Sequence, residues 1–144
     1  AKTSLKNLGP CLVDLDTLRR GPLAHDLGDA WRSWTNRSGE DDPEATLDLS
    51  LLDAAARGYA AGAGDTLTPD EIASLPIGLE RIALELAARF CADAYEDRYF
   101  GWNPDKFASR REHNLVRAQG QFSLWRAVAG KREEIREIVA GAFG

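Results

Sequence analysis

Two acidic stretches near the start of the chain, Val13-Asp14-Leu15-Asp16-Thr17 and Asp26-Leu27-Gly28-Asp29-Ala30, lie on either side of Gly21-Pro22-Leu23. In the first, apolar and charged side chains alternate between two glycine–proline breakers. This pattern predicts a short β-strand over residues 10–17. The second stretch opens a segment with helical spacing of apolar residues. The chain therefore passes from a strand to a helix through a short turn, and aspartates concentrate at this junction.

These aspartates are the main candidates for chemistry in the sequence. An aspartate at the end of a short strand can direct a hard oxygen ligand into a cleft, as Mg²⁺ requires. Asp14 is the candidate for such a ligand. A plainer interpretation is that Asp14 and Asp16 face solvent while Asp26 caps the helix that begins there. The spacing alone does not decide between these two interpretations.

The remainder of the chain is predicted to be helical. Apolar residues recur at helical spacing over 25–34 and again from Leu49 to Tyr59. Thr68-Pro69-Asp70-Glu71 is typical of a capping box, and Pro76 predicts a short helix followed by a long one from about Ile77. Two further helices are expected before and after Gly130, the first with Leu115, Ala118, Phe122 and Trp125 on one stripe. The expected fold is mainly α.

Composition excludes several classes of function. The 144 residues carry a net charge of −5 with a pI near 5.1, which argues against binding to a nucleic-acid backbone. No run of about 20 apolar residues suggests a membrane span. The two cysteines, Cys11 and Cys91, lie in apolar runs and are expected to be buried, reduced thiols of a cytoplasmic protein. With only His25 and His113 as histidines, no zinc ligand set is predicted.

The two acidic stretches and the Gly-Pro-Leu between them closely resemble a signature of the aminoglycoside-phosphotransferase-like small-molecule kinases, nearest the N-acetylhexosamine 1-kinase branch. The resemblance continues to about residue 128, through Arg57-Gly58-Tyr59, Leu67–Ile72, Arg89-Phe90, Tyr99-Phe100 and His113-Asn114-Leu115. It implies the helical C-terminal lobe of a protein-kinase-like fold, forming one domain over residues 1–144, with a short strand or β-hairpin near its N-terminus.

The resemblance also implies roles for individual residues. Asp14 matches the aspartate that binds the Mg²⁺ bridging the ATP phosphates. Asp26 matches a buried aspartate that braces the catalytic loop through hydrogen bonds. Asp16, Arg32 and His113 would lie near the acceptor side of the cleft as substrate-binding candidates, with a structural role as the alternative for Arg32 and His113. Mg²⁺ and ATP are thus the implied cofactors, and a small hydroxyl compound is the implied substrate.

Two parts of the family's machinery do not occur in these 144 residues. The catalytic His-Gly-Asp is absent, so the resemblance implies a catalytic base upstream of Ala1. The nucleotide-binding N-terminal lobe is absent as well. This chain by itself is therefore expected to be inactive in phosphate transfer. The alternative hypothesis is a stand-alone α-helical binding module without catalysis.

Overall fold

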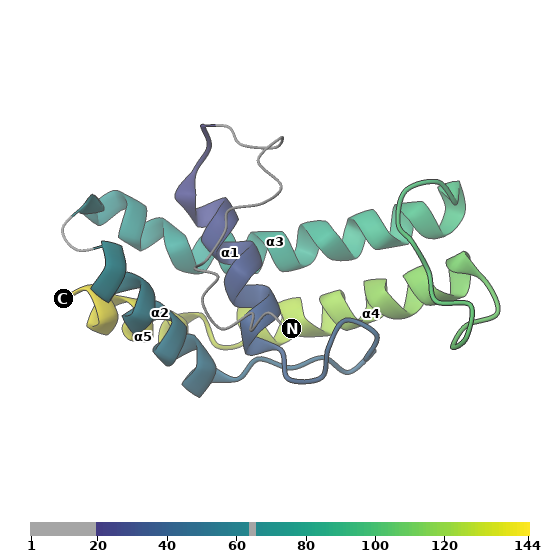
Figure 1. The fold of residues 1–144 in the computed structure, drawn as a ribbon. Coiled ribbons are helices and arrows are strands. Elements are labelled where there is room, and N and C mark those ends of the chain that lie inside the picture. Colours follow the sequence, from purple (N-terminus) through teal and green to yellow (C-terminus); the bar gives the residue numbers. More distant parts are fainter. Residues whose placement is uncertain (1–19, 64–65) are drawn as a thin grey trace, which may run out of the picture.

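The computed structural model describes residues 20–63 and 66–144. All regular structure in these ranges is helical (Figure 1), which confirms the mainly-α expectation. The helices are α1 (Leu23–Thr35), α2 (Leu49–Ala63), α3 (Pro69–Glu96), α4 (Arg110–Ala129) and α5 (Arg132–Phe143). The strand expected over 10–17 lies outside the described residues.

Local capping signals set the starts of three helices. The predicted capping box of α3 is confirmed, since Thr68 Oγ1 accepts from the Glu71 amide at 3.3 Å and Glu71 Oε2 accepts from the Thr68 amide at 2.8 Å. Ser109 caps α4 by accepting from the Glu112 amide at 3.1 Å. The Asp48 carboxylate accepts from the Ser50 and Leu51 amides at 2.9 and 3.1 Å and so begins α2.

The prediction that Pro76 divides α3 is wrong. One helix of 28 residues runs from Pro69 to Glu96 with Pro76 inside it. A proline in a helix interior removes one hydrogen bond and costs about 3 kcal/mol. Here Pro76 and its neighbours Leu75 and Leu79 are buried, and this packing offsets the lost bond. The sequence rule therefore failed because tertiary contacts outweigh a local preference.

Two glycines let α1 cross α3 at very short range (Figure 1). A Cβ added at Gly78 would lie 2.0 Å from the carbonyl oxygen of Ala24, and one added at Gly28 would lie 2.6 Å from the Gly78 carbonyl group. Neither position has room for a side chain, so the backbones of the two helices touch. This contact fixes where α1 lies on α3.

The core draws on all five helices. Trp31 of α1 is fully buried among Leu52 and Ala56 of α2, Leu75 and Leu79 of α3, Leu124 and Val128 of α4, and Ile135 and Val139 of α5. Ala45 and Leu47 from the segment between α1 and α2 complete it. Helix α5 packs against one end of α3 and carries α2, which also contacts α1, while α4 lies along the remainder of α3. The cleft described below lies toward the other end of the α3–α4 pair.

The apolar stripe noted in the sequence of α4 is not the buried face of this helix. Leu115 and Phe122 are exposed, at 38% and 45%, whereas His113, Asn114, Gly120 and Gln121 are buried. The polar residues face inward because each bonds to a partner there: His113 to Asp41, Asn114 to Asp93 and Gln121 to Arg32. Hydrophobic periodicity carries no information about such hydrogen-bonding partners.

The thiol expectation is also wrong in part. Cys91 is exposed on α3, and Cys11 lies outside the described residues. Among the helices that the structure describes, none combines the length and apolar character needed to cross a bilayer.

Gly78→Ala is expected to lower the free energy of unfolding by about 1–3 kcal/mol, because its methyl group would overlap the Ala24 backbone and push α1 off α3. Gly58→Ala is the matched control, since Gly58 lies on the exposed side of α2 with nothing within 4 Å of the added Cβ. That change should stabilise by about 0.5–1 kcal/mol. Urea unfolding measures both, and equal effects would contradict the close contact.

Candidate functional site

A cleft of about 760 Å³ lies between α1, α3 and the loop that joins α3 to α4. Charged side chains form much of its wall, and aromatic side chains form another part. The charged residues are Asp26, Asp29, Arg32, Glu40, Glu85, Arg89 and Arg117, with His25 beside them. Phe90, Phe100 and Trp102 supply the aromatic part. The volume falls within the usual range for a small-molecule site.

Helix α1 contributes one row of charged residues to the cleft. Asp26, Asp29 and Arg32 follow each other at three-residue intervals and so share a face, while Leu27 and Trp31 face the core. The Arg32 guanidinium donates from Nε to Asp29 Oδ1 at 2.9 Å and from Nη1 to Gln121 Oε1 at 3.4 Å. These bonds hold Arg32, whose side chain is only 11% exposed, toward the cleft.

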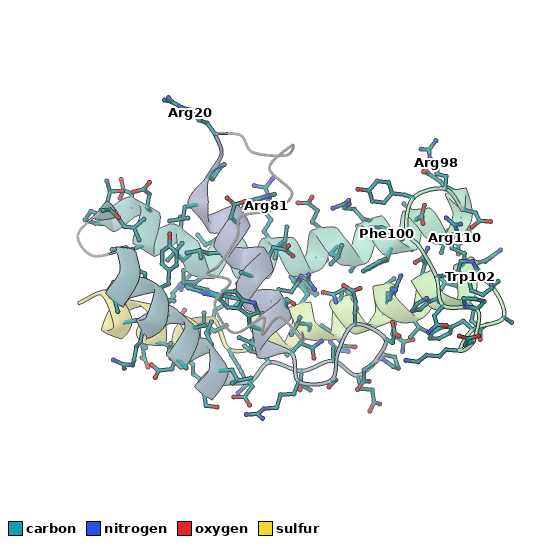
Figure 2. All side chains as sticks on the ribbon, in the orientation of Figure 1. Arg20, Arg81, Arg98, Phe100, Trp102 and Arg110 are labelled. Carbon is teal, nitrogen blue, oxygen red and sulfur yellow. The ribbon has the colours of Figure 1, made fainter. Side chains whose placement is uncertain are left out.

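Phe90 and Phe100 of the aromatic wall belong to a packed cluster at the junction of α3 and the following loop. Phe90 and Phe100 have ring centroids 4.3 Å apart, and Tyr99 meets Phe100 edge-on at 4.8 Å. The Arg89 guanidinium lies over Tyr99 and Phe100, at 5.5 and 5.4 Å from their ring centroids. Figure 2 shows Phe100 and Trp102 on this loop, close to the ends of α3 and α4.

Asp93 holds this loop in shape. Its carboxylate, 4% exposed, accepts from the amides of Arg98, Tyr99 and Phe100 at 3.2, 2.8 and 2.9 Å. It also accepts from Asn114 Nδ2 at 2.9 Å, which ties the loop to α4. Burial raises the pKa of the Asp93 carboxyl, but the three amides and the charge of Arg110 outweigh it and hold the pKa below 3.8.

His113 ties two other segments together behind the cleft. Its Nδ1 accepts from the Asn103 amide at 3.2 Å, so the neutral ring carries its proton on Nε2, which lies 2.6 Å from Asp41 Oδ1. Phe107 stacks on the ring with centroids 4.0 Å apart. Both ring nitrogens are thus engaged within the protein, and the side chain is 1% exposed. His113 positions the cleft walls and does not line the cleft.

The carboxylate of Asp41 collects several cationic partners. Arg117 Nε lies 3.4 Å from Asp41 Oδ1, and Lys106 Nζ lies 3.6 Å from Asp41 Oδ2. The hydrogen bond from His113 lowers the pKa of Asp41 most. The charges of Arg117 and Lys106 lower it further against burial, so this pKa lies below 3.8.

The structure brings some of the predicted site residues together. Asp26 and Arg32 both line the cleft, although Asp26 is exposed and not buried as the resemblance implies. His113 lies behind the cleft wall, and Asp14 and Asp16 lie outside the described residues. Sequence reasoning assigned no role to Glu40 or Arg117. Glu40 lies in the acidic run Glu40-Asp41-Asp42, whose composition is that of a polar loop, and Arg117 lies 77 residues further along the chain.

The described residues bring together no group of three or more His, Cys, Asp or Glu side chains able to hold a metal ion. The chain matches no model of a known protein family. Chemically, the cleft can hold a small polar molecule with its hydroxyls among carboxylates and guanidinium groups and its apolar face against the aromatic wall.

Asp41→Asn is expected to lower the free energy of unfolding near neutral pH, because an amide is a weaker acceptor than a carboxylate for His113 and Arg117. Folding lowers the pKa of Asp41, so the charged form stabilises the protein above the unfolded value of 3.8 and this stabilisation is lost as the pH falls through the lowered pKa. Urea titrations between about pH 7 and 2.5 should show the gap between wild type and variant narrowing below pH 3.8.

Glu44→Gln is the matched control for that experiment. It also removes one negative charge, and Glu44 lies on the same segment but outside the cleft lining. It should leave the pH dependence close to that of the wild type. If the difference in free energy of unfolding between wild type and Asp41→Asn stays constant down to the lowest pH, the assigned partners do not stabilise the charged form of Asp41.

Proposed function

We propose that this chain is the helical, acceptor-binding part of an ATP- and Mg²⁺-dependent phosphotransferase that acts on a hydroxyl group of a sugar, an aminosugar or a similar small molecule. The observation that carries the proposal is the position of the cleft. Helix α1 begins at Leu23, six residues after Thr17, and its Asp26 and Asp29 form part of the cleft wall. The motif that resembles a kinase signature thus leads straight into a small-molecule-sized site.

The lining of the cleft supports an acceptor of this class. Carboxylates and guanidinium groups can bond to several hydroxyls at once, and the Phe90–Phe100–Trp102 surface suits the apolar face of a sugar ring. Asp93 and His113 hold the surrounding loops without occupying the cleft. Such a fixed site favours reaction by orienting the acceptor hydroxyl before transfer.

Phosphate transfer in this proposal forms one bond and breaks another. The acceptor oxygen bonds to the γ-phosphorus of ATP, the bond from that phosphorus to the β–γ bridging oxygen breaks, and ADP leaves. The acceptor proton passes to the carboxylate base that the resemblance places upstream of Ala1. Asp14 would hold Mg²⁺, which supplies charge neutralisation for the transferring group. Mg²⁺ takes one or two protein carboxylates with water and phosphate oxygens, so it needs no three-carboxylate cluster in the described residues.

A second candidate is an α-helical binding module without catalysis. Leu115 and Phe122 of α4 and Ile77 and Leu84 of α3 are exposed apolar side chains, the kind of surface that partner proteins cover. The two candidates differ in what the open reading frame encodes upstream of Ala1. A His-Gly-Asp motif there favours the phosphotransferase, and its absence favours the binding module.

Asp14→Asn, made in the full-length product of the gene, is expected to lower the rate of phosphate transfer by about a hundredfold or more, because one Mg²⁺ ligand loses its charge. The measurement is ADP release with N-acetylhexosamines and related hydroxyl compounds as acceptors. Asp53→Asn on α2, outside the cleft lining, is the control and should retain activity.

Circular dichroism should show both variants folded. If Asp14→Asn keeps its activity and its Mg²⁺ dependence, the metal assignment is wrong. If the wild-type product transfers phosphate to none of the acceptors, the phosphotransferase proposal is wrong and the binding module is the better account.

A further inference from the structure

The cleft is charged unevenly along its length. At one end, near the start of α1, Asp26 lies beside His25, whose Nε2 is 3.6 Å from Glu85 Oε2. At the other end Arg32 and Arg117 enter from α1 and α4. Asp26 and Arg32 are six residues apart on one helix, so the two ends are separated by about 9 Å along its axis. A monosaccharide with one substituent has about this length.

The two arginines are held in place by partners within the cleft wall and behind it. Arg32 is fixed by Asp29 and Gln121, at 2.9 and 3.4 Å. Arg117 donates from Nη1 to the Gly101 carbonyl at 2.8 Å and from Nε to Asp41 at 3.4 Å. Their side chains are only 11% and 17% exposed, so both are ordered before any ligand arrives. Two ordered guanidinium groups are a strong arrangement for binding an anion.

Between the two arginines stands a single carboxylate that is held only weakly. Glu40 Oε1 lies 3.8 Å from Arg32 Nη1, and Glu40 Oε2 lies 3.8 Å from Arg117 Nε. Both distances exceed a hydrogen bond, and the Glu40 side chain is 41% exposed on a segment without regular structure. Each oxygen of this carboxylate faces one arginine, as the oxygens of a bound anion would. A ligand anion could take this position by turning Glu40 out into solvent.

We propose that Arg32 and Arg117 form an anion subsite in the cleft, and that the molecule bound there carries a carboxylate or phosphate group in addition to its hydroxyls. The choice of a hydroxyl compound rests on the proposed function. The anionic group lies at the arginine end, and the reacting hydroxyl lies toward the Asp26 end, near the start of α1. Glu40 occupies the subsite in the unbound protein and competes with the ligand.

Binding of glucuronate, glucose and glucose 6-phosphate to the 144-residue chain, measured by titration calorimetry, tests this proposal. Glucuronate or glucose 6-phosphate should bind at least about tenfold more tightly than glucose. Glu40→Gln should strengthen binding of the charged sugar about threefold or more, because the competing charge is gone. Glu44→Gln removes the same charge outside the cleft and should leave the affinities for glucose and for the charged sugars unchanged.

Arg117→Gln should remove the preference for the charged sugars, and a circular dichroism spectrum checks that it folds. Because Glu40→Gln changes an exposed side chain, the test does not depend on the stability of the arginine variant. Preference for only one of the two charged sugars identifies the anion as carboxylate or phosphate. Equal affinities for glucose and both charged sugars, equal effects of Glu40→Gln and Glu44→Gln, or no binding at all would overturn the proposal. Failure of the phosphotransferase assay with anion binding intact would overturn the proposed reaction alone.

Discussion

The contact between Gly28 and Gly78 is the constraint on which the site depends. Where two helices meet without side chains between them, their backbones lie in one close arrangement, and even a methyl group would displace it. Because α1 is fixed there, the row of Asp26, Asp29 and Arg32 is carried to a set place opposite Glu85 and Arg89 of α3. A different crossing would separate the two charged walls of the cleft.

Two buried polar side chains fix the positions of the irregular segments, as the two glycines fix the crossing of α1 and α3. Asp93 gathers three consecutive amides of the α3–α4 loop, and His113 links the Asn103 amide to Asp41. Buried groups of this kind are costly when unpaired, so each fixes the position of the segments that supply its partners. The cleft thus has walls made partly of loops, yet those loops are attached at defined points to α3 and α4.

The sequence predicted best what short-range interactions decide. The capping box at Thr68 and Glu71 was readable because both of its residues are local, and the helices around Trp31, Leu52 and Ile135 followed from their apolar spacing. Prediction from the sequence failed where contacts between residues distant in sequence determine the structure. Pro76 stays in a helix because of packing, and α4 turns His113 and Gln121 inward toward residues more than 70 positions away in sequence.

The candidate site divides in the same way. Asp26 and Arg32 could be found because they follow a motif on one helix, and both line the cleft. Glu40 and Arg117 could not be found together, since one lies in a loop of polar composition and the other on a distant helix, and only the fold brings them within 3.8 Å. A single sequence without such a motif does not indicate which charged residues meet across a cleft.

Pro76 affects the local unfolding of α3. Proline has no amide hydrogen, so the carbonyl of Ile72 lacks the donor that would normally come from four residues on, and one rung of the helix is missing there. Ile72 and Ala73, before Pro76, lie beside Val139 and Ala140 of α5. After Pro76, Gly78 carries the contact with α1, and Glu80 accepts from Arg132 of α5. Amide hydrogen exchange is therefore expected to show different protection in the segments of α3 before and after Pro76, and the cleft lies against the second segment.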